Sequence, residues 1–272
     1  MAGSLARLFL MFSPLFRGVR RVPWVGGLAH RISHRVLPAD ELIWVRVRRG
    51  IGEGLWLKLH PRTGQDYFEG YVEPALQEIL CKHLLPGMVF YDIGANIGFF
   101  TLLAARMVGA RGKVYTFEAD PDVADRLREN VEKNEFRNVI IVRQAVWSSK
   151  GSVTFSRADE SQSPDLGLGR VTSSAVVGEK SIEVPCTSVD EFVATEVRPD
   201  FIKCDVEGAE CEVVAGGQRV LTECRPLMVC EVHSDQNASR LAQVFATLNY
   251  SLNWFTRSHF IAAPCERDEP HQ

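Results

Sequence analysis

Two acidic residues stand where a nucleoside could be recognised. Asp92 ends an apolar run that begins at Val89, and a glycine-containing turn and an apolar helical segment follow it. Glu118 ends the next apolar run, twenty residues after Gly98. A carboxylate at the end of a second strand can accept hydrogen bonds from both hydroxyls of an adenosine ribose. The helix start favours an anionic group, and Asp92 is suited to bind an ammonium group directly or through water.

The sequence of the turn distinguishes between two classes of cofactor. It reads G-x-x-x-G from Gly94 to Gly98, and it lacks the G-x-G-x-x-G pattern of dinucleotide-binding enzymes. The carboxylate of Asp92 would repel a pyrophosphate, whereas it would attract the amino group of S-adenosylmethionine. We therefore favour S-adenosylmethionine and keep a nicotinamide-dependent oxidoreductase as a less favoured alternative.

A second group of ionisable residues follows two later apolar runs. Asp205 and Glu207 come at the end of one run, and Glu231 and His233 come at the end of the next. In an open α/β sheet such strand ends line the ligand crevice, and strand alternation puts Glu231 and His233 on one face. Charges in buried strands are costly without a purpose, so we expect these four residues to be catalytic.

The chemistry of this group leaves alternatives open. Asp205 or Glu207 would accept or orient the proton of an acceptor hydroxyl. Asp205, Glu231 and His233 are also ligands that a divalent metal accepts, but acceptor binding explains the same residues, so we expect no metal. A purely structural interpretation also exists, since acids favour a helix N-terminus and a single histidine is often structural.

Alternating strands and helices must position these residues. From residue 88, apolar runs of strand length alternate with helical segments, which predicts a parallel sheet with right-handed crossovers. Residues 43–59 alternate around a glycine-rich turn and predict a hairpin. Pro74 opens a helix that ends near Leu84. The Ser/Gly/Asp-rich stretch Arg157–Glu179 predicts a mobile loop that helps to close the acceptor site.

Composition excludes some classes of protein and indicates a compartment. The chain has 272 residues and a net charge of −3. Residues 1–50 hold nine arginines and two acids, which leaves 22 basic against 32 acidic residues in the remainder. A nucleic-acid binder normally shows a basic footprint, so we expect no nucleic-acid partner. The seven cysteines are odd in number and form no C-x-x-C, which favours a reducing, cytoplasmic location.

The N-terminal segment combines apolar residues with arginines. An apolar cluster between Leu5 and Phe16 is flanked by arginines and contains Pro14. It is shorter than the ~20 residues of a membrane span. The pattern fits an interfacial amphipathic helix with peripheral contact to an anionic membrane. Packing on the catalytic domain or on a partner subunit explains it equally well.

Several motifs together resemble the FkbM-type family of S-adenosylmethionine-dependent methyltransferases. They are Y-V-E-P (71–74), D-I-G-A-N-I-G (92–98), F-E-A-D-P (117–121), I-K-C-D-V-E-G-A-E (202–210) and E-V-H (231–233). The resemblance covers roughly residues 70–263. The family pattern often has F-E-P after the second strand, so F-E-A-D-P is a small departure.

The resemblance implies a fold and a domain layout. With the strand–helix alternation it predicts an α/β fold of the class I methyltransferase type, a Rossmann-like sheet of seven strands. The expected order is 3-2-1-4-5-7-6, with strand 7 antiparallel. We divide the chain into a basic and apolar segment (1–39), a β-hairpin extension (40–70) and a cofactor-binding domain (71–265).

The resemblance also implies a cofactor, its contacts and an acceptor. S-adenosylmethionine would be contacted by Asp92, Gly94, Ala95, Asn96, Gly98 and Glu118. Gln144 and Ala145 come after the third strand, where adenine is usually held. Members typically O-methylate hydroxyls of sugars, polyketides or related metabolites. We therefore expect a small-molecule or lipid-linked glycan acceptor, and keep a non-catalytic S-adenosylmethionine-binding partner protein as the alternative.

Overall fold

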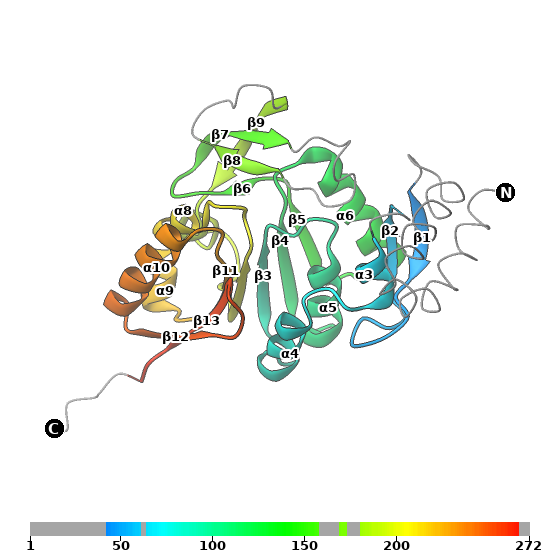
Figure 1. Ribbon diagram of the computed structural model, residues 1–272, viewed down its shortest axis with the longest axis horizontal. Helices are drawn as coiled ribbons and strands as arrows, with labels where there is room; N and C mark the ends of the chain where they lie inside the picture. The colour runs from blue at the N-terminus through cyan, green and yellow to red at the C-terminus, as the bar shows by residue number, and fades with distance from the viewer. Residues whose placement is uncertain (1–41, 61–63, 158–168, 173–179, 267–272) are drawn as a thin grey trace, which may run out of the picture.

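The structure is a computed structural model that describes residues 42–60, 64–157, 169–172 and 180–266 (Figure 1). The predictions for residues 1–39, and for most of the stretch 157–179, fall outside these ranges and stay predictions. Within the described residues, no helix is long and apolar enough to cross a membrane. All seven cysteines lie in the described part, and all are free thiols.

The central element is a seven-stranded sheet. In chain order its strands are β3 (Val89–Ile93), β4 (Lys113–Phe117), β5 (Val139–Val142), β10 (Phe201–Cys204), β11 (Leu227–Glu231), β12 (Tyr250–Trp254) and β13 (His259–Pro264). Their spatial order is β5-β4-β3-β10-β11-β13-β12, which is 3-2-1-4-5-7-6 when counted along the chain. β13 is antiparallel to β11 and β12, whereas β5, β4, β3, β10 and β11 pair in parallel. The order and the antiparallel strand agree with the sequence prediction.

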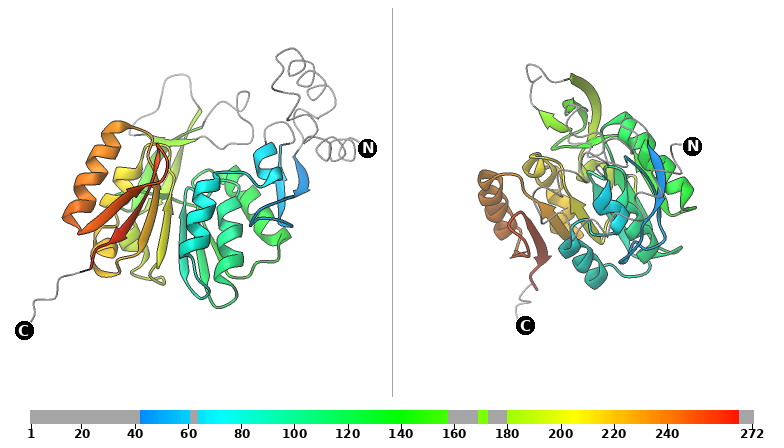
Figure 2. Two further views of the ribbon diagram at one scale, coloured as in Figure 1. Left: turned by 60° about the horizontal axis from the view of Figure 1, so that its bottom comes forward. Right: turned by 45° about the vertical axis from the view of Figure 1, so that its right-hand side comes forward.

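Helices cover both faces of this sheet (Figures 1 and 2). They are α3 (Gln65–Glu69), α4 (Pro74–His83), α5 (Phe99–Val108), α6 (Pro121–Lys133), α7 (Val189–Phe192), α8 (Glu210–Ala215), α9 (Gln218–Glu223) and α10 (Asp235–Thr247). Successive strand residues face opposite sides. Phe90 therefore packs in one core with α4, α5 and α6, whereas Tyr91 packs in a second core with α7 to α10.

Two helix starts follow directly from the sequence. The Asp120 side chain accepts the backbone N–H of Asp122, and Pro121 is the first residue of α6. The Ser188 side chain accepts the N–H of Glu191 and so caps α7. Both caps satisfy N–H groups that have no partner within their own helix.

The predicted hairpin is present and is docked on the main domain. β1 (Ile43–Arg46) and β2 (Trp56–Leu59) pair antiparallel. The backbone N–H groups of Trp56 and Lys58 donate to the side chains of Asn134 (2.8 Å) and Asn130 (2.7 Å), near the end of α6. These amides satisfy backbone groups that an edge strand would otherwise expose. The hairpin thereby shares the core of α4, α5 and α6.

A second, four-stranded sheet lies across one end of the central sheet (Figure 1). Its strands are β6 (Ala145–Val146), β7 (Gly151–Arg157), β8 (Arg170–Thr172) and β9 (Lys180–Thr187). The stretch 157–179 was predicted to be a loop, but Arg157 and Arg170–Thr172 belong to strands. Arg157 ends β7 and pairs with Asp120 (2.7 Å), and β8 pairs with β7. β5 ends at Val142, and Ala145 lies outside the central sheet and pairs with β9.

Candidate active site

A cavity opens at the carboxyl ends of the central strands, below the small sheet. It holds about 600 Å³ of empty space, part of which is open to solvent. Its lining comes from β3, β4, the small sheet and the loop after β10: Ile93, Gly94, Asn96, Phe117, Glu118, Ala119, Gln144, Ala145, Val146, Phe155, Gly169, Val171, Asp205, Val206 and Glu207. Seven of the twelve predicted site residues thus face one space: Gly94, Asn96, Glu118, Gln144, Ala145, Asp205 and Glu207.

The glycine turn after β3 is held by the strands on both sides. The N–H groups of Gly94 and Ala95 both donate to the carbonyl of Phe117, at 3.1 and 3.0 Å. Gly94 has a φ of +76°, and a Cβ there would lie 1.7 Å from the carbonyl oxygen of Asp205. A Cβ at Gly98 would lie 2.2 Å from the side chain of Leu127. Ala95 and Gly98 do not line the cavity, and their role is to pack the turn and α5.

Asp92 also lies beneath the cavity and is absent from its lining. It is fully buried, and its Oδ2 accepts a hydrogen bond from Thr101 at 2.6 Å. Its Oδ1 lies 3.4 Å from Lys203 Nζ, which donates to the carbonyl of Gly94 at 3.0 Å. Asp92 therefore neutralises Lys203, and Lys203 fixes the turn. Direct contact between Asp92 and an ammonium group is not supported.

Lys203 forms ion pairs with acids from two neighbouring strand ends, Asp92 and Asp205. Its Nζ lies 3.4 Å from Oδ2 of Asp205, on the opposite side from Asp92. Burial alone would lower the pKa of Lys203, but the carboxylates of Asp205 and Asp92 outweigh burial and hold that pKa above its ordinary value. The ammonium group is thus permanently charged.

Glu118 presents its carboxylate to the cavity in a fixed orientation. Oε2 accepts the N–H of Asn96 and Oε1 accepts the N–H of Asp120, each at 2.9 Å. Burial raises the pKa of Glu118 to about 7, although both N–H groups act in the opposite direction. Each carboxylate oxygen offers a second acceptor position, so the pair matches two vicinal hydroxyls.

His233 is exposed and does not line the cavity, but acids hold both of its ring nitrogens. Its Nδ1 lies 2.6 Å from Oε1 of Glu210, and its Nε2 lies 3.3 Å from Oε2 of Glu207. Glu210 is fully buried and also accepts hydrogen bonds from Gly208 N–H and the Asn237 amide. The hydrogen bond to Glu210 raises the pKa of His233 to about 9, against the effect of burial. His233 is therefore an imidazolium at neutral pH, which excludes it as the free base.

The remaining predicted residues differ in their surroundings. Glu207 has a φ of +50° and lines the cavity, and burial raises its pKa. Glu231 lies behind Asp205 and does not line the cavity. Burial and the nearby charge of Asp205 raise the pKa of Glu231 to about 7. Asp205 and Glu207 are thus the two acids that an acceptor in the cavity would meet.

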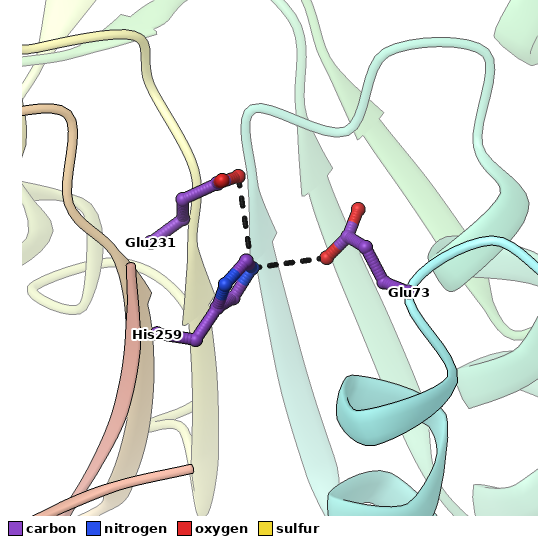
Figure 3. A group of neighbouring side chains, drawn as sticks. All are labelled: Glu73, Glu231 and His259. Carbon is purple, nitrogen blue, oxygen red and sulfur yellow. Dashed lines mark hydrogen bonds and ion pairs between the residues drawn. The ribbon is translucent and has the colours of Figure 1, made fainter. Parts of the chain in front are cut away.

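Sequence reasoning missed two residues beside Glu231. Glu73 directly precedes α4, and its Oε2 lies 3.1 Å from Nε2 of His259, at the start of β13 (Figure 3). The same nitrogen lies 3.6 Å from Oε2 of Glu231. Glu73 belongs to the Y-V-E-P motif, which was the one available signal. His259 stands alone in the sequence, and only the antiparallel pairing of β13 with β11 places it opposite Glu231.

The fold and the site define the chain as a methyltransferase-type α/β protein. The sequence matches the Methyltransferase FkbM domain over residues 92–252. The chain belongs to the FkbM methyltransferase family, and the predicted resemblance is confirmed.

Individual relatives cover different shares of the chain. The chain is 32% identical to the hexuronic acid methyltransferase AglP of Haloferax volcanii, over 54% of this chain and 56% of that protein. It thus spans about half the length of that relative. It is 28% identical to the 2-O-methyltransferase NoeI of Sinorhizobium fredii, over 71% of this chain and 84% of that protein. The crystal structure of methyltransferase FkbM from Methylobacillus flagellatus superposes with a TM-score of 0.46 at 14% identity, covering 73% of this chain and 54% of that one.

Proposed function

We propose that this protein is an S-adenosylmethionine-dependent O-methyltransferase that acts on a hydroxyl of a sugar or a sugar-like metabolite. Membership of the FkbM methyltransferase family supports the reaction class. The names of two relatives, a hexuronic acid methyltransferase and a 2-O-methyltransferase, support a carbohydrate acceptor. The same family membership argues against the nicotinamide-dependent oxidoreductase.

One observation carries the proposal: a single cavity joins Glu118 to Asp205 and Glu207. Glu118 would accept hydrogen bonds from the ribose diol of the cofactor, and Gln144 and Ala145 would hold its adenine. Asp205 and Glu207 stand at the other end, where an acceptor hydroxyl would lie. A non-catalytic cofactor-binding protein has no need of two acids in the same cavity.

The cofactor would supply a methyl group activated by a positively charged sulfur. The side chains of this protein then have two tasks, to position the acceptor and to take its proton. Positioning within about 3 Å of the methyl group accounts for much of such catalysis. Glu207 suits the second task, because its raised pKa makes it a better proton acceptor than an exposed carboxylate. Asp205 is fixed by Lys203 and is suited to orient the hydroxyl.

Methyl transfer from labelled S-adenosylmethionine tests the proposal directly. The full chain is incubated with a panel of glycosides that includes hexuronic acids, and products are identified by mass spectrometry. We expect one labelled methyl ether on a sugar hydroxyl. Tight cofactor binding without transfer to any hydroxyl compound, including those of a cell extract, would favour the non-catalytic alternative.

Replacement of Glu118 tests the cofactor end of the cavity. Glu118→Gln removes the charge that two ribose hydroxyls would meet, which costs ~1.5–3 kcal/mol or roughly ten- to a hundredfold in affinity. Calorimetry with S-adenosylhomocysteine measures it. Glu132→Gln on the exposed side of α6 is the matched control and should bind normally. Unchanged affinity in Glu118→Gln would remove this residue from the site.

The raised pKa of Glu118 predicts a pH dependence of cofactor binding. Ribose hydroxyls donate to the carboxylate form, so binding favours the deprotonated state. With a pKa of about 7 in the free protein, affinity should be full above pH 8 and about tenfold weaker at pH 6. Calorimetric titrations at both values check this. The Glu118→Gln variant should lose this dependence, which separates it from titration of the ligand itself.

A further inference from the structure

Three potential ligand atoms converge beside the acceptor end of the cavity. They belong to Glu73 before α4, Glu231 at the end of β11 and His259 at the start of β13, and Figure 3 shows the three side chains pointing toward one another. All three ligand atoms lie within 4.8 Å of one another. His259 is 7% exposed, whereas Glu73 and Glu231 are half-buried, so a buried imidazole anchors a group that solvent can reach.

Two separations within this group are close to those between ligands of one ion. Two donor atoms that each lie about 2.1 Å from a metal, at tetrahedral to octahedral angles, are about 3.0–3.5 Å apart. Nε2 of His259 lies 3.1 Å from Oε2 of Glu73 and 3.6 Å from Oε2 of Glu231. Only a small side-chain adjustment would bring all three into a coordination shell.

The second ring nitrogen of His259, Nδ1, has the hydrogen-bond partners that orient a metal-binding histidine. Nδ1 of His259 lies 3.0 Å from Oγ1 of Thr256 and 3.0 Å from Oγ of Ser258. A hydrogen bond at one ring nitrogen fixes the tautomer and aims the other nitrogen at the ion. When Nδ1 carries the proton, the Nε2 lone pair faces two carboxylate oxygens. Only a positive species between them makes this arrangement stable.

The neighbouring cations of the site are already engaged. Lys203 lies between Asp92 and Asp205, and His233 is bound by Glu210 and Glu207. Since these two described cations are engaged, the positive species is either a proton on His259 or an external ion.

We propose that Glu73, Glu231 and His259 form a binding site for one divalent ion of the Mn²⁺ class. Two carboxylates and one imidazole are a mixed oxygen and nitrogen set that suits such ions. Three protein ligands leave coordination positions open, and Glu231 also lies within 4.8 Å of Asp205, which lines the cavity. Acceptor oxygens can fill these positions. Ion binding itself does not depend on the proposed function, whereas this role toward an acceptor rests on it.

A second group that shares Glu231 is a weaker candidate. Asp205, Glu231 and His233 also lie within 4.8 Å of one another. Both carboxylates are 3.9 Å from Nε2 of His233, while Glu207 lies closer, at 3.3 Å. His233 would have to leave Glu207 to bind an ion with Asp205 and Glu231.

Titration of the full-length protein with Mn²⁺, followed by electron paramagnetic resonance, tests the site. The signal of free Mn²⁺ disappears on binding, so the measurement gives the number of sites and the affinity without any enzyme assay. We expect one site per chain. Glu73→Gln and His259→Gln should each weaken it at least tenfold, because an amide replaces a charged or imidazole ligand. Glu78→Gln and His83→Gln, on α4 directly after Glu73 but outside the group, are the matched controls and should bind normally.

Two outcomes would overturn the proposal. One is the absence of saturable Mn²⁺ binding, which would leave His259 as a protonated ion-pair partner only. The other is loss of binding in His233→Gln but not in Glu73→Gln. Circular dichroism verifies that each variant folds, and Glu73→Gln decides the matter if His259→Gln does not fold. Methyl transfer is measured separately: transfer without Mn²⁺ binding overturns only this inference, and Mn²⁺ binding without transfer overturns only the proposed function.

Discussion

Gly94→Ala should fail to give a stably folded protein. The added Cβ would lie 1.7 Å from the carbonyl oxygen of Asp205, and the residue would also keep a φ of +76°. The overlap is with backbone of the neighbouring turn, so no side-chain rotation relieves it. The turns after β3 and β10 would have to separate, and Lys203 would lose its hydrogen bond to the carbonyl of Gly94. Destabilisation above about 4 kcal/mol is exceptional and has such causes.

Gly87→Ala is the matched control for backbone strain alone. Gly87 has a φ of +92°, but a Cβ there would meet nothing within 4 Å. We expect it to lose about 1–2 kcal/mol, a fall of roughly 2–8 °C in melting temperature for a domain of this size. Thermal unfolding followed by circular dichroism compares the two variants. Equal melting temperatures would show that the turn after β3 moves freely and that Gly94 is kept for another reason.

Gly94 was predicted to belong to the site, but the reason why it must be glycine was only partly predicted. The family resemblance implies that Gly94 contacts the cofactor. Gly94 does line the cavity, but its Cβ position is filled by the protein itself. The glycine pattern of the turn indicates that a side chain is excluded at this position. It does not identify the neighbouring group that excludes the side chain.

The central sheet was predictable because its signals are local. Each strand is a short apolar run, three helices begin at a side chain that caps them, and parallel strands joined by helices allow few arrangements. The pairing of the small sheet was not predicted, because β7 and β9 are separated in the sequence by the stretch 158–179. Ser-, Gly- and Asp-rich composition predicts a loop whether or not a strand such as β8 lies within it.

Some residues of the site were likewise predictable from the sequence, and others were not. Glu118, Asp205 and Glu207 follow strands of a parallel sheet, so their strand ends already place them at the cavity. Asp92 ends a strand too, but its burial depends on Lys203 and Thr101, whose contacts no spacing rule predicts. His259 and Glu73 are 186 residues apart. Their contact depends on the position of α4 relative to the antiparallel strand β13, which the sequence pattern does not specify.

Glu207→Gln should have the largest effect on turnover. The amide keeps the shape of the side chain but cannot take a proton from an acceptor hydroxyl. Loss of a positioned proton acceptor lowers the rate by typically 10²–10⁴-fold, so we expect a fall in kcat of about a hundredfold or more. Glu207 lies at the opposite end of the cavity from Glu118, so cofactor affinity should change little. A fall in kcat without a loss of cofactor binding identifies a group that acts in the transition state.

Two further variants make this result specific to Glu207. Asp205→Asn should also lower kcat, but by less, because the amide can still orient a hydroxyl while Lys203 loses one of its two carboxylate partners. Glu212→Gln, on α8 and outside the cavity lining, should retain full turnover. Calorimetry with S-adenosylhomocysteine and initial rates with the identified acceptor separate binding from chemistry. Full turnover in both Glu207→Gln and Asp205→Asn would place the proton acceptor elsewhere, and an equal loss of cofactor affinity would mean that Glu207 shapes the cavity and does not act on the acceptor.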